Sequence, residues 1–151
     1  MTHKLHIEFE TGPETVVQGD SFTVTLNILN IGDQIFPGGT FSYFRVKYIG
    51  GDASQSALGD LEIPEIPVEN SWSITKTLYA ISDGISWVEA QIKSNDEEVI
   101  EYYQSRRGPV HQEWSMPFYV QNRESYDIIS LLQKILEKLD EINEKLRGQA
   151  K

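Results

Sequence analysis

The chain has 151 residues, of which 39% are hydrophobic, 24% charged and 11% aromatic, the composition of a globular protein rather than a disordered one. Its formal net charge of −10 disfavours phosphate backbones, so nucleic acid is not an expected partner. The absence of cysteine excludes disulfides and thiolate chemistry, and no apolar run reaches the length of a membrane span. We therefore expect one domain with an appendage and no membrane span.

The first third of the chain alternates apolar and polar residues, as half-buried β-strands do. Residues 5–9 form a first predicted strand, which Gly12-Pro13 ends. Residues 22–28 show the cleanest alternation, and we expect this strand at the centre of the core. A third strand is predicted over residues 41–49, where aromatic and β-branched side chains gather.

The middle of the chain is interrupted by prolines. Pro64 and Pro67 lie within residues 52–70, and proline lacks the backbone donor that a central strand needs. This segment is predicted to be an edge strand or an extended crossover.

Further strands are predicted at residues 72–78, 85–93, 99–103 and 114–120. We expect the last two to pair as a hairpin across residues 106–109. Seven or eight short strands separated by turn residues predict two packed antiparallel sheets. The fold class is therefore mainly β, an immunoglobulin-like antiparallel β-sandwich over residues 1–121.

The end of the chain changes from strand to helix periodicity. Asn122 or Ser125 is a suitable N-cap for a helix over residues 125–148. Leucine and isoleucine then alternate at steps of four and three residues, giving a heptad seam with Leu at a and Ile at d. Residues 122–151 are interpreted as one C-terminal amphipathic, coiled-coil oligomerisation helix, whose seam residues are Ile128, Leu132, Ile135, Leu139, Ile142 and Leu146.

Leu at a with Ile at d favours assemblies larger than dimers, so we expect a homo-oligomer, a trimer or a tetramer. Three further apolar residues, Ile129, Leu131 and Leu136, widen the first part of the stripe. The alternative is that a single chain folds the helix back onto its own sheet. We favour self-association, because a fold-back has no need of so regular a heptad spacing.

In residues 17–33, Gly19-Asp20 precedes an alternating strand that ends at Asn30-Ile31-Gly32. This segment and two later ones resemble CARDB-like and related bacterial and archaeal immunoglobulin-like domains. Residues 66–75 look like the segment leading into strand E of these domains, and residues 84–92 look like strand F. The resemblance covers residues 5–120 and implies a fold and a binding or scaffolding role, with no catalytic residue.

No catalytic motif, phosphate-binding loop or cofactor is predicted, and an enzyme is the minority interpretation. His3 and His6 point to opposite faces of a strand, so a shared metal is not expected. Calcium binding by the acidic residues 95–101 is left open beside a simple solvated loop. Among the aromatic residues, most are expected in the core. The candidate ligand surface for protein or carbohydrate comprises Tyr102, Tyr103, Arg106 and Arg107.

The favoured function is a non-enzymatic binding or scaffolding module made multivalent by the coiled coil. The alternatives are an accessory domain of a carbohydrate-active or metal-assisted enzyme, and a structural subunit of a larger assembly. The first residues run directly into a strand pattern without an apolar leader. The chain as written is therefore expected in the cytoplasm, although the family it resembles is found in exported proteins.

Overall fold

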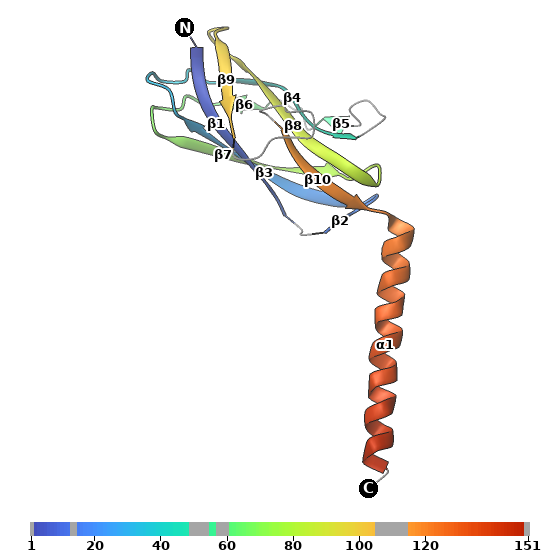
Figure 1. Ribbon diagram of the computed structural model, residues 1–151. Helices are drawn as coiled ribbons and strands as arrows, with labels where there is room; N and C mark the ends of the chain where they lie inside the picture. Colours follow the sequence, from blue (N-terminus) through green and yellow to red (C-terminus); the bar gives the residue numbers. More distant parts are fainter. Residues whose placement is uncertain (1, 13–14, 49–54, 57–60, 105–114, 150–151) are drawn as a thin grey trace.

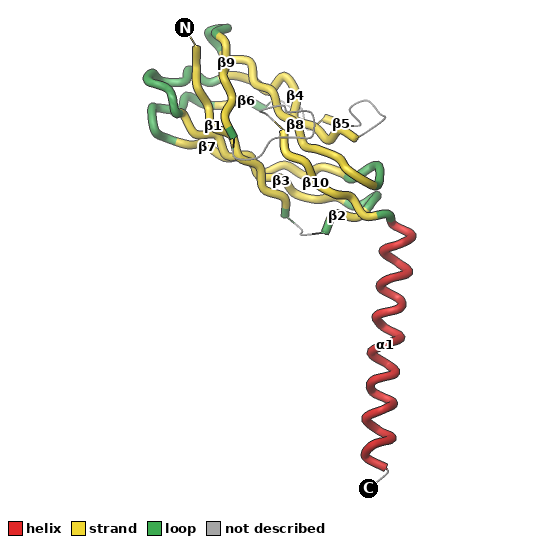
Figure 2. Tube along the Cα trace, in the orientation of Figure 1, coloured by secondary structure: helices red, strands yellow, loops and turns green. Residues whose placement is uncertain are grey.

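The computed structural model describes residues 2–12, 15–48, 55–56, 61–104 and 115–149. Two β-sheets are stacked face to face, and one long helix leaves the end of the sandwich (Figures 1 and 2). The predicted β-sandwich with one C-terminal helix is confirmed. No helix in the described part of the chain is long and apolar enough to cross a membrane.

The smaller sheet has four strands in the order β7-β3-β1-β9. The predicted central strand is confirmed, because β3 pairs with β7 on one side and with β1 on the other. The bounds of these strands are β1 Thr2–Thr11, β3 Ser21–Asn30, β7 Ser71–Tyr79 and β9 Val99–Tyr103.

The larger sheet has six strands in the order β2-β10-β8-β4-β5, with β6 also paired to β4. Within residues 52–70, the proline-containing segment, the described residues contribute two short strands to this sheet, β5 and β6, and both pair with β4, as expected of an edge segment. The bounds are β2 Val16–Val17, β4 Gly39–Tyr48, β5 Gln55–Ser56, β6 Glu62–Ile63, β8 Gly84–Ser94 and β10 Ser115–Gln121.

The predicted hairpin between residues 99–103 and 114–120 is wrong. β9 joins the smaller sheet and runs parallel to β1, whereas β10 joins the larger sheet and runs antiparallel to β8. A second parallel pair links β2 to β10, so the sandwich is not purely antiparallel. The local sequence identifies each strand. Which strand it pairs with depends on how the apolar side chains of distant segments pack together in the core.

The core lies between the sheets and is built from the inward residues of each strand. Leu5, Ile7 and Phe9 of β1 are all buried, which follows the predicted alternation. The Phe9 ring meets the Phe44 ring edge-on from the opposite sheet, with centroids 6.2 Å apart. The buried cluster contains no residue of the helix, so the core of the sandwich is complete without it.

The helix α1 spans Arg123–Gln149. Its N-cap is Asn122, whose Oδ1 accepts a hydrogen bond from the Ser125 backbone N–H at 3.0 Å. Of the two predicted caps the structure therefore selects Asn122, and the helix begins two residues earlier than predicted.

Candidate functional site

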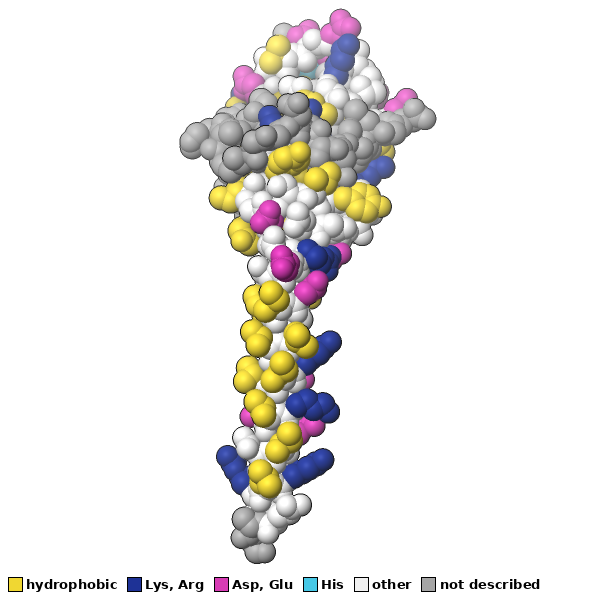
Figure 3. All heavy atoms as spheres, turned by 90° about the vertical axis from the view of Figure 1, so that its right-hand side faces the viewer, with side chains coloured by type: hydrophobic (Ala, Val, Ile, Leu, Met, Phe, Trp, Pro, Cys, Tyr) yellow, Lys and Arg dark blue, Asp and Glu magenta, His cyan; other side chains and the backbone are white. Residues whose placement is uncertain are grey.

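The helix seam, defined as the six predicted heptad residues, is the most prominent apolar surface of the described chain. Its side chains are between 46% and 56% exposed, and α1 has no buried residue. They line up with other apolar side chains in a stripe along the helix (Figure 3). Contiguous exposed apolar surface is typical of interaction sites, so the helix seam is a candidate for one.

The helix does not fold back onto its own sheets. It projects away from the sandwich along its whole length (Figure 1). The fold-back alternative therefore does not describe this structure, and the helix seam has no covering surface within the described part of its own chain.

Polar contacts tie the first turn of α1 to the sandwich. The Arg123 Nε donates to the Gln18 carbonyl oxygen at 3.2 Å, and its guanidinium also pairs with the Asp20 carboxylate. The Asn122 amide donates to the Asp83 carboxylate at 3.4 Å. These contacts hold the start of the helix against the turns that contain Asp20 and Asp83. We call the end of the sandwich that carries these two turns the stalk end.

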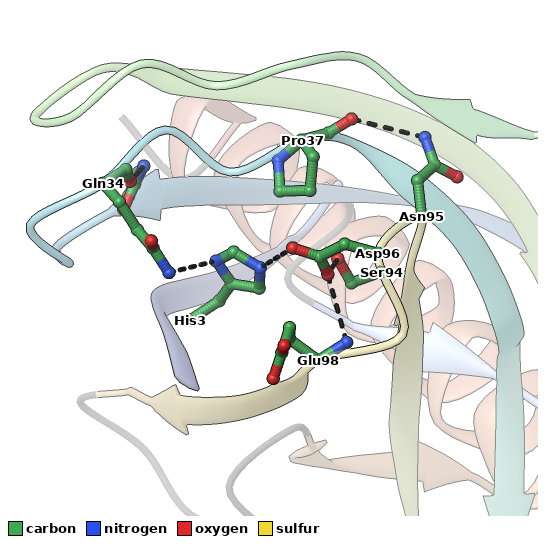
Figure 4. Close-up of polar contacts among 8 residues, drawn as sticks. His3, Gln34, Pro37, Ser94, Asn95, Asp96 and Glu98 are labelled. Carbon is green, nitrogen blue, oxygen red and sulfur yellow. Dashed lines mark hydrogen bonds and ion pairs between the residues drawn. The ribbon is translucent and has the colours of Figure 1, made fainter. Parts of the chain in front are cut away.

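The opposite end of the sandwich, which we call the free end, carries the turns at residues 31–38, 67–70 and 95–98 beside the first residues of β1. A polar cluster there joins the start of β1 to the turns at residues 31–38 and 95–98 (Figure 4). The buried His3 ring places Nε2 2.8 Å from an Asp96 carboxylate oxygen and Nδ1 3.5 Å from the Gln34 amide nitrogen. The cluster thus fixes β1 to two turns.

Asp96 is held as a carboxylate by hydrogen bonds within its own turn. Ser94 Oγ donates to it at 2.6 Å and the Glu98 backbone N–H at 3.1 Å. These bonds, that of Ser94 foremost, and the nearby His3 lower the pKa of Asp96 from 3.8 to about 2. The lone pairs of Asp96 are therefore engaged in organising the turn.

No group of three His, Cys, Asp or Glu side chains in the described ranges is arranged to hold a metal ion. The two described histidines lie as predicted on opposite faces of β1, with His3 buried and His6 partly exposed. His6 lies 3.3 Å from Glu8. The calcium alternative for residues 95–101 gains no support from this geometry.

The candidate ligand surface needs a correction at Tyr102. Its side chain is only 6% exposed and belongs to the core, because even-numbered residues of β9 face inward at this position. Tyr103 is 43% exposed and its hydroxyl donates to Glu101 at 2.9 Å. Arg106 and Arg107 lie outside the described residues. Only Tyr103 of the four predicted residues is therefore seen to face solvent.

A buried carboxylate on the larger sheet was missed by the sequence analysis. Glu89 of β8 is 1% exposed, and its oxygens accept from Trp87 Nε1 at 2.6 Å and from Arg45 Nε at 3.2 Å. Its neighbours Val88 and Ala90 face the core, so Glu89 lies on the other face of the sheet. The sequence did carry an indication, since Glu89 is the one acidic residue of the strand and lies between the apolar residues Val88 and Ala90.

Arg45 also stacks on an aromatic ring. Its guanidinium carbon lies 3.9 Å from the centre of the Tyr43 ring, a cation–π contact on the same face as Glu89. Both carboxylate oxygens of Glu89 accept a hydrogen bond, so we interpret Glu89 and Arg45 as a structural ion pair rather than Glu89 as a reactive acid.

No protein-family model matches the chain, and no curated protein is similar to it. Among solved structures it is similar to a CARDB domain from Pyrococcus furiosus, crystallised in complex with di-metal ions, at 16% identity and a TM-score of 0.49. The match covers 80% of this chain and 88% of that domain. A solution structure of the same domain matches at 15% identity and a TM-score of 0.46, covering 78% and 93% of the two chains. The likeness concerns the fold alone, and no residue role is transferred from it.

Proposed function

We propose that this protein is a non-enzymatic binding or scaffolding module whose β-sandwich is displayed in three or four copies by coiled-coil association of α1. The observation that carries the proposal is the exposed helix seam on a helix that its own sandwich does not cover. Joining several weak binding surfaces raises their effective concentration, so the assembly binds a repetitive ligand more tightly than one copy does. The ligand belongs to the protein or carbohydrate class.

The energetics favour association over an isolated helix. Most of the stability of a helix in a protein comes from packing of its apolar face, and α1 has no buried residue in the single chain. Complete burial of a leucine or isoleucine side chain contributes about 1.5–3 kcal/mol relative to full exposure, and the seam residues are half-exposed. Burying the six of them therefore contributes on the order of 6 kcal/mol per chain before the entropy of association is subtracted.

Sedimentation velocity on the full chain and on a version ending at Asn122 tests the proposal. We expect the full chain to sediment as a trimer or tetramer at micromolar concentration and the shortened chain as a folded monomer, because the sandwich core contains no helix residue. A full chain that sediments as a monomer over this range would contradict the proposal.

A point-substituted pair removes the need for truncation. Leu139→Asp with Ile142→Asp places two carboxylates in the seam, where they would lose their hydration, and should give a monomer. The matched control, Ser130→Asp with Gln133→Asp, adds the same charge outside the seam and should leave the assembly intact. Dissociation by both pairs would show that charge alone, and not the seam, controls association.

A further inference from the structure

The apolar surface of α1 is wider beside the sandwich than near the C-terminus. In heptad terms, the positions that flank the helix seam, e and g, are apolar from Ile129 to Leu136, where they are Ile129, Leu131 and Leu136, and the g position before them is Glu124. The same positions in the second half are polar, with Lys138 and Lys145 at g and Asn143 at e. The three apolar residues are between 45% and 61% exposed, so they add to the uncovered surface.

We propose that copies of α1 associate in parallel, with all sandwiches at the same end of the bundle. This inference rests on the proposed function and adds the orientation of the partner, a second copy of this chain. Parallel helices bring same-numbered levels together, so the wide apolar half of each helix meets the wide half of its neighbour. The narrower, polar-flanked halves then also meet each other.

The flanking residues distinguish the two orientations. In a parallel coil, a g residue lies beside the following e residue of its neighbour. Leu131 then contacts Leu136 of the partner subunit, and Lys138 lies beside Asn143 of the partner subunit. Leu131 and Leu136 therefore cover each other in every helix–helix contact, and Ile129 lies beside Glu124 of the partner subunit.

An antiparallel coil that keeps all six seam layers in register gives poorer pairs. Positions g then face g and positions e face e, so Leu131 lies beside Lys145 of the partner subunit. Ile129 lies beside Asn143 of the partner subunit, and Lys138 faces Lys138 of the partner subunit. Like charges placed opposite each other are unfavourable. Leu136 does face Leu136 of the partner subunit, but Leu131 is left beside a lysine, whereas the parallel coil covers both leucines.

The junction gives this orientation a consequence for function. Arg123 and Asn122 tie each helix start to the stalk end of its sandwich. The free end, where β1 begins, lies on the side of the sandwich away from the helix (Figure 1). In a parallel bundle, therefore, the free ends of all copies are presented on one side, which suits a ligand repeated on a surface.

Cysteine crosslinking tests the orientation, because the native chain contains no cysteine. Gln149 continues the heptad seam as a d position and Ser125 as an a position. With a short bismaleimide reagent, full-length Gln149→Cys should crosslink most of the chain into covalent dimers if the helices are parallel. In an antiparallel bundle two residues 149 lie about 36 Å apart along the bundle axis, at 1.5 Å of rise per residue, and do not crosslink.

Two further variants complete the experiment. Glu144→Cys, on the outward face of the same turns, measures collisional crosslinking and should react far less than Gln149→Cys. The double variant Ser125→Cys with Gln149→Cys crosslinks in either orientation, because antiparallel helices place positions 125 and 149 in one layer. Crosslinking of the double variant without crosslinking of Gln149→Cys alone would overturn the parallel orientation.

Sedimentation of the same variants separates failure of the orientation from failure of the proposed function. Oligomeric protein whose Gln149→Cys variant crosslinks no more than Glu144→Cys contradicts the parallel bundle and leaves the multivalent module standing. Monomeric protein in every variant overturns both.

Discussion

The Tyr102 hydroxyl bridges the two sheets by bonding both backbone groups of Ile92. It accepts a hydrogen bond from the Ile92 N–H at 2.9 Å and donates to the Ile92 carbonyl oxygen at 3.1 Å. Tyr102 belongs to β9 of the smaller sheet and Ile92 to β8 of the larger one. A residue that the sequence placed on a ligand surface is thus a structural link across the core.

Tyr102→Phe removes both bonds and leaves two backbone groups of Ile92 without these partners in a buried position. We expect the free energy of unfolding to fall by about 1–3 kcal/mol in urea denaturation. The exposed Tyr103→Phe is the matched control and should change stability by no more than about 0.5 kcal/mol. Equal effects of the two substitutions would contradict the bridging role.

The same tyrosine predicts a change at alkaline pH. Burial raises the pKa of Tyr102 from 10.0 to about 12, so the fold favours the protonated phenol. The stability this contributes is present below pH 10.0 and is lost as the pH rises towards about 12. The stability difference between the native chain and Tyr102→Phe should therefore shrink over this range, as measured by urea denaturation at each pH.

At the buried ion pair, Arg45→Met should destabilise the sandwich because it removes a donor and leaves Glu89 charged inside the protein. We expect a loss of about 2–3 kcal/mol, typical of a hydrogen bond to a charged group. In a Glu89→Gln background the same substitution should cost less, since no buried charge is then left unpaired. A double-mutant cycle by chemical denaturation measures this coupling. Additive effects of the two substitutions would contradict a stabilising interaction between Arg45 and Glu89.

Acid stability depends on the turn at the free end. Because the pKa of Asp96 is lowered from 3.8 to about 2, its carboxylate adds stability above pH 3.8 that is lost as the pH falls towards about 2. Asp96→Asn should therefore show a shallower fall in the free energy of unfolding over this range than the native chain. Ser94→Ala, which removes the main hydrogen bond to Asp96, should also make the fall in the free energy of unfolding shallower. Parallel curves for all three proteins would contradict this role for Asp96.

Association through α1 predicts that helix melting depends on protein concentration. Mass action stabilises an assembled helix as concentration rises, whereas a sandwich that folds by itself has no such dependence. Circular dichroism at a helical wavelength should report a midpoint that rises with concentration. Tryptophan fluorescence, whose three residues all precede α1, should report a transition that does not. Coincident, concentration-independent transitions would contradict association.

Strand positions followed from the sequence because each depends on local alternation. The inward faces of β1 and β3 are those that the alternation predicted, since a period of two assigns side chains to faces without knowledge of the partner strand. The direction and partner of β9 did not follow. They depend on contacts between distant segments, such as Thr2 with Val99, that leave no trace in local periodicity.

By itself, the sequence determined two things about this protein: a β-sandwich and a terminal helix with a heptad seam, both set by the spacing of apolar residues along the chain. Only the tertiary structure decided that Tyr102 points inward, that His3 and Asp96 meet across 93 positions, and that Glu89 is buried against Trp87. It also decided that α1 projects from the sandwich without any of its residues being buried. The physical reason is that burial and polar pairing depend on which distant segments the two sheets bring together, and residue spacing does not encode this.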